Sequence, residues 1–200
     1  MKNTLKNDSS DLKAGDFPGM EAIEKQITDL RAQVEALSKA APDDKISMIV
    51  FSGDLDKVLA SLIIATGAVA MGLEVVMFFT FWGTSVLRDK DKKVGGKDFM
   101  GKMCGAMLPK GTCSVKISKM NMGGMGTAMM KSLMEKKNVA SLEQMLEMAG
   151  ELGVQIYVCE MSMDLMGFKR EEMIPYPKME FCGVAKFLED AKGSRIQLFI

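Results

Sequence analysis

Cys159 is the residue of this sequence best placed for covalent chemistry. It ends the apolar run VQIYVC, and the methionine-rich segment EMSMDLMG follows it at once. A cysteine between a strand and a helix lies beside unpaired backbone N–H groups and the positive end of the helix dipole, which favour the nucleophilic thiolate. The adjacent Glu160 carboxylate opposes this effect unless its side chain points away. Because buried structural cysteines are common, position alone leaves both interpretations open.

The chain contains four cysteines and no histidine. The segment GKMCGAM indicates a core position for Cys104, and Cys113 follows PKGT near the start of a short predicted strand. Cys182 precedes the last predicted helix, so it is the second candidate thiol, although a sequence does not give its distance from Cys159. These spacings match no zinc ribbon and CxxC is absent, and the lack of histidine removes Ser-His triads. We therefore expect no metal and no cofactor.

A glycine- and methionine-rich segment occupies residues 118–134, SKMNMGGMGTAMMKSLM. Gly123 and Gly124 precede a predicted helix, where backbone N–H groups could hold a phosphate or a sulfur anion. Their spacing differs from that of the dinucleotide-binding fingerprint. Methionine thioethers favour Cu(I), but we interpret these residues as flexible packing around an irregular pocket or a subunit interface.

Strand and helix patterns alternate along residues 45–200. The apolar runs KISMIVF, LEVVMFFTF, VQIYVC and RIQLFI are separated by helical segments. This alternation predicts an α/β fold with a doubly wound, mainly parallel sheet flanked by helices on both faces. Ligands and reactive groups of such sheets collect beyond the carboxyl ends of the strands, and Cys159 lies at such an end.

Residues 58–83 form an apolar stretch long enough to span a bilayer, with Glu74 as its one charge. We favour a division at Gly72 into a buried helix over residues 55–71 and an inner strand over residues 74–80. The charged residues Asp54, Asp56 and Lys57 at the helix start support this division. We therefore expect no membrane attachment.

The N-terminal part of the chain differs from the rest. Residues 1–19 are polar and predict disorder. Residues 20–41 predict a helix, and its apolar residues follow a heptad pattern: Ile23, Ile27, Leu30, Val34 and Leu37. This seam packs either on the surface of the α/β domain or against a second copy of the helix, and the sequence favours neither.

The overall composition excludes several classes of function. In 200 residues, Lys+Arg and Asp+Glu balance at 26 each, and aromatic residues make up 6%. No basic surface for nucleic acid is indicated. The polar N-terminal segment is not a secretory signal, and four cysteines do not make a disulfide scaffold, so we expect a cytoplasmic protein with reduced thiols.

Four segments of the sequence resemble the DsrE/DsrF-like family. They are FFTFWG (78–83), SKMNMGGMGTAMMK (118–131), KKNVASLEQML (136–146) and CEMSMDLMG (159–167). The likeness runs from about residue 45 to residue 200 and is greatest to the larger, methionine-rich branch, often labelled peroxiredoxin-like. It implies a doubly wound α/β domain, assembly as a trimer or hexamer, and sulfurtransferase activity. It also implies that Cys159 carries sulfane sulfur as a persulfide between partner proteins of the TusA-like or rhodanese-like type.

The predicted site follows from this resemblance and from the local pattern. We expect Ser162, Met163 and Met166 of the following turn to line a pocket around Cys159, with Gly123 and Gly124 reaching it from across the site. Sulfur transfer is exchange at divalent sulfur, so it needs no general base. The alternative is a non-catalytic oligomeric assembly or sensing module bound through its methionine-rich surface. Cys159→Ser separates the two, because only sulfur transfer needs this thiol.

Overall fold

The computed structural model describes residues 19–92, 94–95 and 99–200. The predicted disordered segment, residues 1–19, therefore lies outside the described residues except for Gly19. The chain divides into two compact units, residues 1–41 and 42–200. In the first unit, helix α1 (Met20–Ala40) carries the predicted heptad seam, and the five apolar side chains of this seam are exposed.

The second unit is built on a five-stranded parallel sheet in the order β4-β3-β2-β1-β5. Its strands are β1 (Asp43–Val50), β2 (Glu74–Phe79), β3 (Gln155–Cys159), β4 (Met179–Cys182) and β5 (Ser194–Phe199). Four of them follow the apolar runs of the sequence. The short edge strand β4 is not predicted by the sequence pattern.

Gly72 separates helix α2 (Leu55–Ala70) from strand β2, as the sequence predicts. Its φ of +84° is a left-handed conformation that glycine adopts without a steric penalty. The chain then reverses into a strand whose last five residues are buried. No helix within the described part of the chain is long and apolar enough to cross a membrane.

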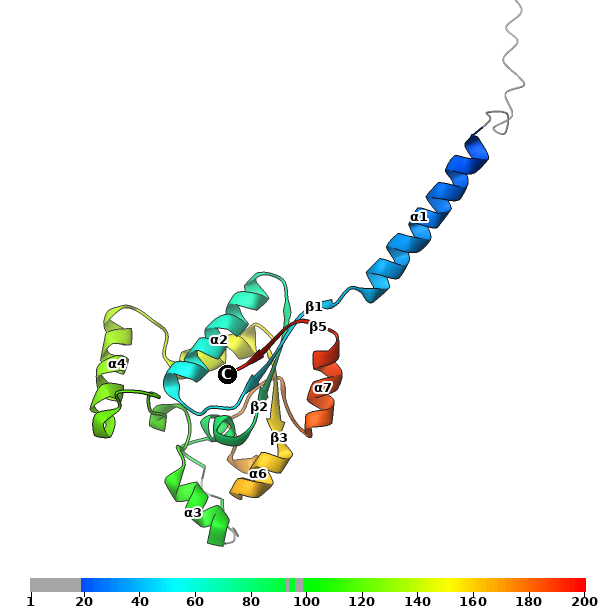
Figure 1. The fold of residues 1–200 in the computed structure, drawn as a ribbon. Coiled ribbons are helices and arrows are strands. Elements are labelled where there is room, and N and C mark those ends of the chain that lie inside the picture. Colours follow the sequence, from blue (N-terminus) through cyan, green and yellow to red (C-terminus); the bar gives the residue numbers. More distant parts are fainter. Residues whose placement is uncertain (1–18, 93, 96–98) are drawn as a thin grey trace, which may run out of the picture. The chain divides into compact units, whose positions relative to one another are not determined.

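Alternate residues of each inner strand enter two different hydrophobic cores. The main core receives Met77 and Ile156 and is covered by α2, α5 (Leu142–Glu151) and α6 (Glu160–Met166). The second core, on the other face of the sheet, receives Phe78 and Tyr157 and is covered by α7 (Val184–Lys192). Figure 1 shows α2 and α7 on opposite sides of the sheet. The predicted doubly wound α/β fold is confirmed.

The remaining elements connect the strands. They are the helices α3 (Phe99–Met107) and α4 (Met125–Lys136) and the 3-10 turns η1 (Phe81–Leu87), η2 (Thr112–Ser114), η3 (Met122–Gly124) and η4 (Arg170–Glu172). Helix α5 begins with the predicted capping box: the Gln144 backbone N–H donates to Ser141 Oγ at 3.2 Å, and the Ser141 backbone N–H donates to Gln144 Oε1 at 2.8 Å.

Candidate functional site

Cys159 is the last residue of β3 and the N-cap of α6. The alternation of side chains along β3 places it in the second core, where it packs with Phe78 and Phe187. The thiol is free, and the residue is only 3% exposed. The predicted position between a strand and a helix is therefore present, at a site shielded from solvent.

Cys182 lies directly beside Cys159. The two residues are register partners at the ends of the parallel strands β3 and β4. Cys182 packs against the second core, so both side chains leave the same face of the sheet. Neighbouring strands lie about 4.8 Å apart, and disulfides join Cα atoms about 4.4–6.8 Å apart. Both thiols are free, and Cys182 is only partly buried, so the two form an adjacent dithiol in which one sulfur is more accessible.

The surroundings of Cys182 disfavour its thiolate. Burial raises the pKa of this thiol, and the charges of Glu180, Cys159 and Glu160 raise it further. Lys186 on α7 acts in the opposite direction and only partly offsets them. Cys182 is therefore held mainly as a thiol at neutral pH.

Glu160, which follows Cys159 in the chain, has a cationic partner. Its carboxylate forms an ion pair with the guanidinium of Arg170. That guanidinium also lies over the ring of Phe181, 5.0 Å from its centroid. The ion pair offsets part of the negative charge that the sequence places next to the thiol.

A polar network lies on the same sheet face, two residues before Cys159. The Tyr157 hydroxyl donates to Asp190 Oδ2 at 2.7 Å, and Lys45 Nζ contacts Asp190 Oδ1 at 2.7 Å. Burial, together with the bond to Asp190, raises the pKa of Tyr157 well above its usual value of 10.0, so the hydroxyl keeps its proton. The network fastens α7 to β1 and β3, and no local sequence signal predicts it because its members are far apart in the chain.

Ser162 joins α6 to the end of β2. Its hydroxyl lies 2.9 Å from Thr80 Oγ1 and accepts a hydrogen bond from the Phe81 backbone N–H at 3.0 Å. The residue is fully buried. Its hydrogen-bonding capacity is thus used within the protein, and its role in the structure is to hold the start of α6 in place.

The other predicted pocket residues belong to the main core or to the turn η3. Met163 and Met166 belong to the main core, on the opposite face of the sheet from Cys159. Gly123 and Gly124 lie in η3, and a Cβ built on either would meet nothing within 4 Å. Helix α4, which follows them at once, lies well away from β3 and α6 (Figure 1). The structure thus places Met163 and Met166 in the main core and Gly123 and Gly124 in η3, and a pocket around Cys159 stays a prediction.

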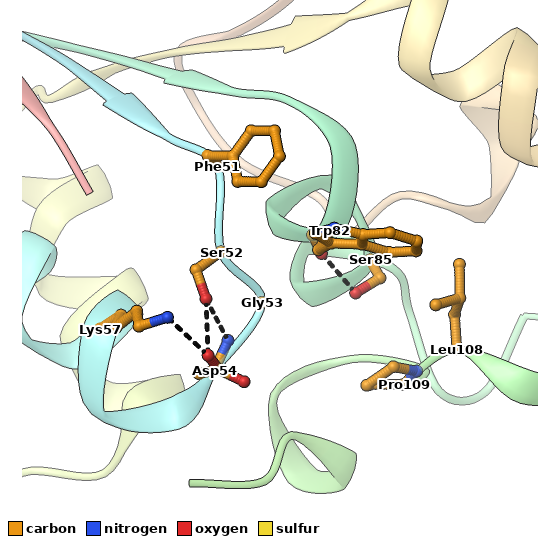
Figure 2. A pocket seen from close by; sticks show the side chains of 9 residues that line it. All are labelled: Phe51, Ser52, Gly53, Asp54, Lys57, Trp82, Ser85, Leu108 and Pro109. Atoms are coloured by element: carbon orange, nitrogen blue, oxygen red, sulfur yellow. Dashed lines mark hydrogen bonds and ion pairs between the residues drawn. The ribbon is translucent and has the colours of Figure 1, made fainter. Parts of the chain in front are cut away.

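A separate cavity of about 320 Å³ lies at the carboxyl ends of β1 and β2 (Figure 2). It is lined by Phe51, Ser52, Gly53, Asp54, Lys57, Trp82, Ser85, Leu108 and Pro109. Asp54 Oδ2 contacts both Ser52 Oγ and Lys57 Nζ at 2.9 Å. The two charged residues that line the cavity, Asp54 and Lys57, are thus paired with each other. The sequence analysis does not predict this cavity, although the segment SGD directly follows the apolar run KISMIVF and marks the carboxyl end of that strand.

No metal centre is built from the described side chains. Within residues 19–92, 94–95 and 99–200, no three or more Cys, Asp and Glu residues come together in a group that could hold a metal ion.

Comparison with known proteins identifies the family. Residues 42–199 match the model of the DsrE/DsrF/DrsH-like family. The chain belongs to this family. It is 43% identical over 156 residues to the uncharacterized protein YrkE of Bacillus subtilis, covering 78% of this chain and 96% of that protein. It is 35% identical over 157 residues to the sulfur carrier protein DsrE2 of Allochromatium vinosum, covering 78% of this chain and 98% of that protein.

A solved structure is also similar to this DsrE/DsrF/DrsH-like chain. The ychN protein of E. coli matches with a TM-score of 0.47 and 12% identity, covering 78% of this chain and 98% of that one.

Proposed function

We propose that this chain is a sulfur carrier that holds sulfane sulfur as a persulfide on Cys159 and passes it to a partner protein. The observation that carries the proposal is the position of Cys159, a free thiol at the carboxyl end of β3 and the N-cap of α6. Membership of the DsrE/DsrF/DrsH-like family supports it, as does the 35% identity to a protein named sulfur carrier DsrE2.

The chemistry consists of two exchanges at divalent sulfur. The Cys159 thiolate attacks the outer sulfur of a donor persulfide, the donor leaves as a thiolate, and Cys159 carries the outer sulfur. An acceptor thiolate then attacks that outer sulfur, and the Cys159 thiolate leaves. Each step forms one S–S bond and breaks another, so neither needs a general base or an external oxidant. A chain without histidine can perform both.

Partner proteins of the TusA-like or rhodanese-like type would supply and accept the sulfur in a reducing cytoplasm. Because Cys159 is buried, such a partner has to dock closely at the end of β3. The exposed apolar side chains of Met161 and Leu165 on α6 offer a contact next to the thiol.

Mass spectrometry of the intact protein tests the carrier role. Full-length protein is incubated with polysulfide, and the wild type is expected to gain sulfur that a thiol reductant removes. Cys159→Ser should lose this gain, whereas the control variants Cys104→Ser and Cys113→Ser should keep it. Uptake by Cys159→Ser at the wild-type rate would refute the proposed carrier.

A second candidate function rests on the surface of α4. Six apolar side chains in and just before this helix are exposed: Met120, Met122, Met125, Met129, Met130 and Leu133. Flexible thioethers suit adaptable binding surfaces, so this surface fits an oligomeric assembly or sensing module, including a trimer or hexamer. Such a module should keep its assembly and its partner binding in Cys159→Ser.

A further inference from the structure

We propose that Cys182 attacks the persulfide of Cys159, closing a disulfide between β3 and β4 and releasing hydrogen sulfide. The inference rests on the proposed carrier function and adds a second outcome for the bound sulfur. The carrier would pass sulfur on when an acceptor is docked and would release it as sulfide when none is.

The register of the two strands carries the inference. Cys159 and Cys182 are direct partners across a parallel pair; Cys159 belongs to the second core and Cys182 packs against it. A spacing of about 4.8 Å between neighbouring strands lies within the range of Cα separations that disulfides join. Because Cys182 faces Cys159 itself, the sulfur it meets first is the inner Sγ of the persulfide.

Both residues end their strands, which leaves room for the small adjustment a disulfide requires. Cys159 is followed by the first turn of α6, and Cys182 is followed by Gly183. A Cβ built at Gly183 would meet nothing within 4 Å, so the backbone after Cys182 is not crowded. The other two cysteines lie elsewhere, with Cys104 in α3 and Cys113 in η2.

Atoms and electrons balance in the attack of Cys182 on the Cys159 persulfide without an added oxidant. The Cys182 thiol first loses its proton to solvent. Its thiolate then attacks Sγ of Cys159, a Cys159–Cys182 bond forms, and the bond from Sγ to the outer sulfur breaks. The outer sulfur takes the electron pair of that bond and leaves, with its own proton and one from solvent, as hydrogen sulfide. The sulfane sulfur is reduced by two electrons, and the two cysteines are oxidised by two.

The Cys159–Cys182 disulfide has to be reduced before the carrier can work again, and the reductant in this scheme is a dithiol. Cys182 is partly exposed, whereas Cys159 is 3% exposed. An incoming dithiol thus reaches the Cys182 sulfur first, and Cys159 leaves as the thiolate. The second thiol of the reductant then releases Cys182, which restores both cysteines.

The first experimental arm is independent of sulfur loading. Reduced full-length protein is oxidised with diamide, and its free thiols are counted and its peptides mapped. The expected product joins Cys159 to Cys182, and a matched Cys104→Ser variant should form it equally well. Retention of all thiols, or a bond between other cysteines, would overturn the inference and leave the carrier proposal standing.

The second arm follows the bound sulfur. Protein loaded with polysulfide is freed of excess reagent, and sulfide release and intact mass are recorded over time. The wild type should lose the added sulfur and end two hydrogens lighter than the reduced protein. Cys182→Ser and Cys182→Ala should hold the persulfide about tenfold longer or more, since the attacking thiol is gone. Equal lifetimes in wild type and both variants refute the inference alone, and failure of Cys159 to load refutes the carrier proposal.

Discussion

The guanidinium of Arg88 and the carboxylate of Glu172 form an ion pair of 3.2 Å in which both side chains are 3% exposed. Arg88 also donates to the carbonyl oxygens of Gly105 and Pro109, and its guanidinium lies 4.5 Å from the centroid of the Phe168 ring. The pair thus ties the end of η1 to α3 and to η4. A buried charge of this kind depends on its partner, because water does not replace the partner once it is removed.

Glu172→Gln should destabilise the protein strongly. The substitution leaves the Arg88 charge buried without a counter-charge, which costs about 3–5 kcal/mol of unfolding free energy in comparable pairs. Urea unfolding followed by circular dichroism measures the loss. The matched control is Glu171→Gln, an exposed neighbour whose change should stay within about 0.5 kcal/mol. Equal stabilities of the two variants would contradict this account.

Asp190 should make the stability depend on acid pH. Burial alone would raise its pKa, but hydrogen bonds from Lys45 and Tyr157 outweigh burial and lower the pKa below 3.8. A carboxyl group whose pKa is lower in the folded than in the unfolded chain stabilises the fold when it is ionised. This stabilisation is complete at pH values above the pKa of the unfolded chain, and it is lost as the pH falls through the pKa of the folded chain.

Unfolding of wild type and Asp190→Asn across the acid range tests this. We expect the stability difference to be largest near neutral pH and to shrink as the pH falls below the ordinary value of 3.8. Asp44→Asn is the control, because the Asp44–Arg195 pair is exposed and should contribute little. A stability difference between wild type and Asp190→Asn that is constant with pH, or that grows in acid, would contradict the stabilising role of the Asp190 carboxylate.

The local features of this fold were predictable from the sequence. Gly72 ends α2 because a left-handed residue stops a helix, and the β-branched and aromatic run after it forms β2. The same local reasoning placed Cys159 at the junction of β3 and α6. Strand β4 was missed because its four residues include Glu180 and form a partly exposed edge, so they lack a strong hydrophobic pattern.

The contacts between distant segments were not predictable. The pairing of Cys159 with Cys182 depends on β4 being the neighbour of β3, and a single sequence does not state strand order. The same limit applies to Gly123 and Gly124, which lie in η3. Two glycines before a helix look locally like an anion cradle, but the topology decides which part of the sheet that helix lies beside. Met163 lies one helical turn after Cys159 and belongs to the main core, whereas Cys159 belongs to the second core.

Helix α1 should contribute to self-association. All five apolar residues of its heptad seam are at least 44% exposed in the described chain, which is unfavourable for side chains of this type in water. Ile27→Glu combined with Val34→Glu should therefore lower the mass of the assembly measured by light scattering at micromolar concentration. Gln26→Glu combined with Gln33→Glu adds the same charge beside the seam and should leave the mass unchanged. A wild-type monomer, or equal masses of the two variants, would refute the role of the seam.

The reactivity of Cys182 should increase steeply with pH. Burial raises its pKa above the ordinary thiol value of 9.0, and Glu180 on β4, Cys159 on β3 and Glu160 on α6 add to this, while Lys186 on α7 opposes it. Alkylation requires the thiolate, so its rate should rise about tenfold per pH unit as long as the pH lies below the pKa.

Iodoacetamide labelling resolved by peptide mapping measures this rate at Cys182 alone. Glu180→Gln removes a neighbouring negative charge, so it should lower the pKa of Cys182 and move the labelling profile to lower pH. Glu151→Gln is the control, because Glu151 is an exposed residue at the end of α5 and is not among the groups that shift the pKa of Cys182. A profile that is flat with pH would show that the thiol is already ionised. A shift of the Glu180→Gln profile to higher pH would contradict the electrostatic account, because removing a negative charge makes the thiolate easier to form.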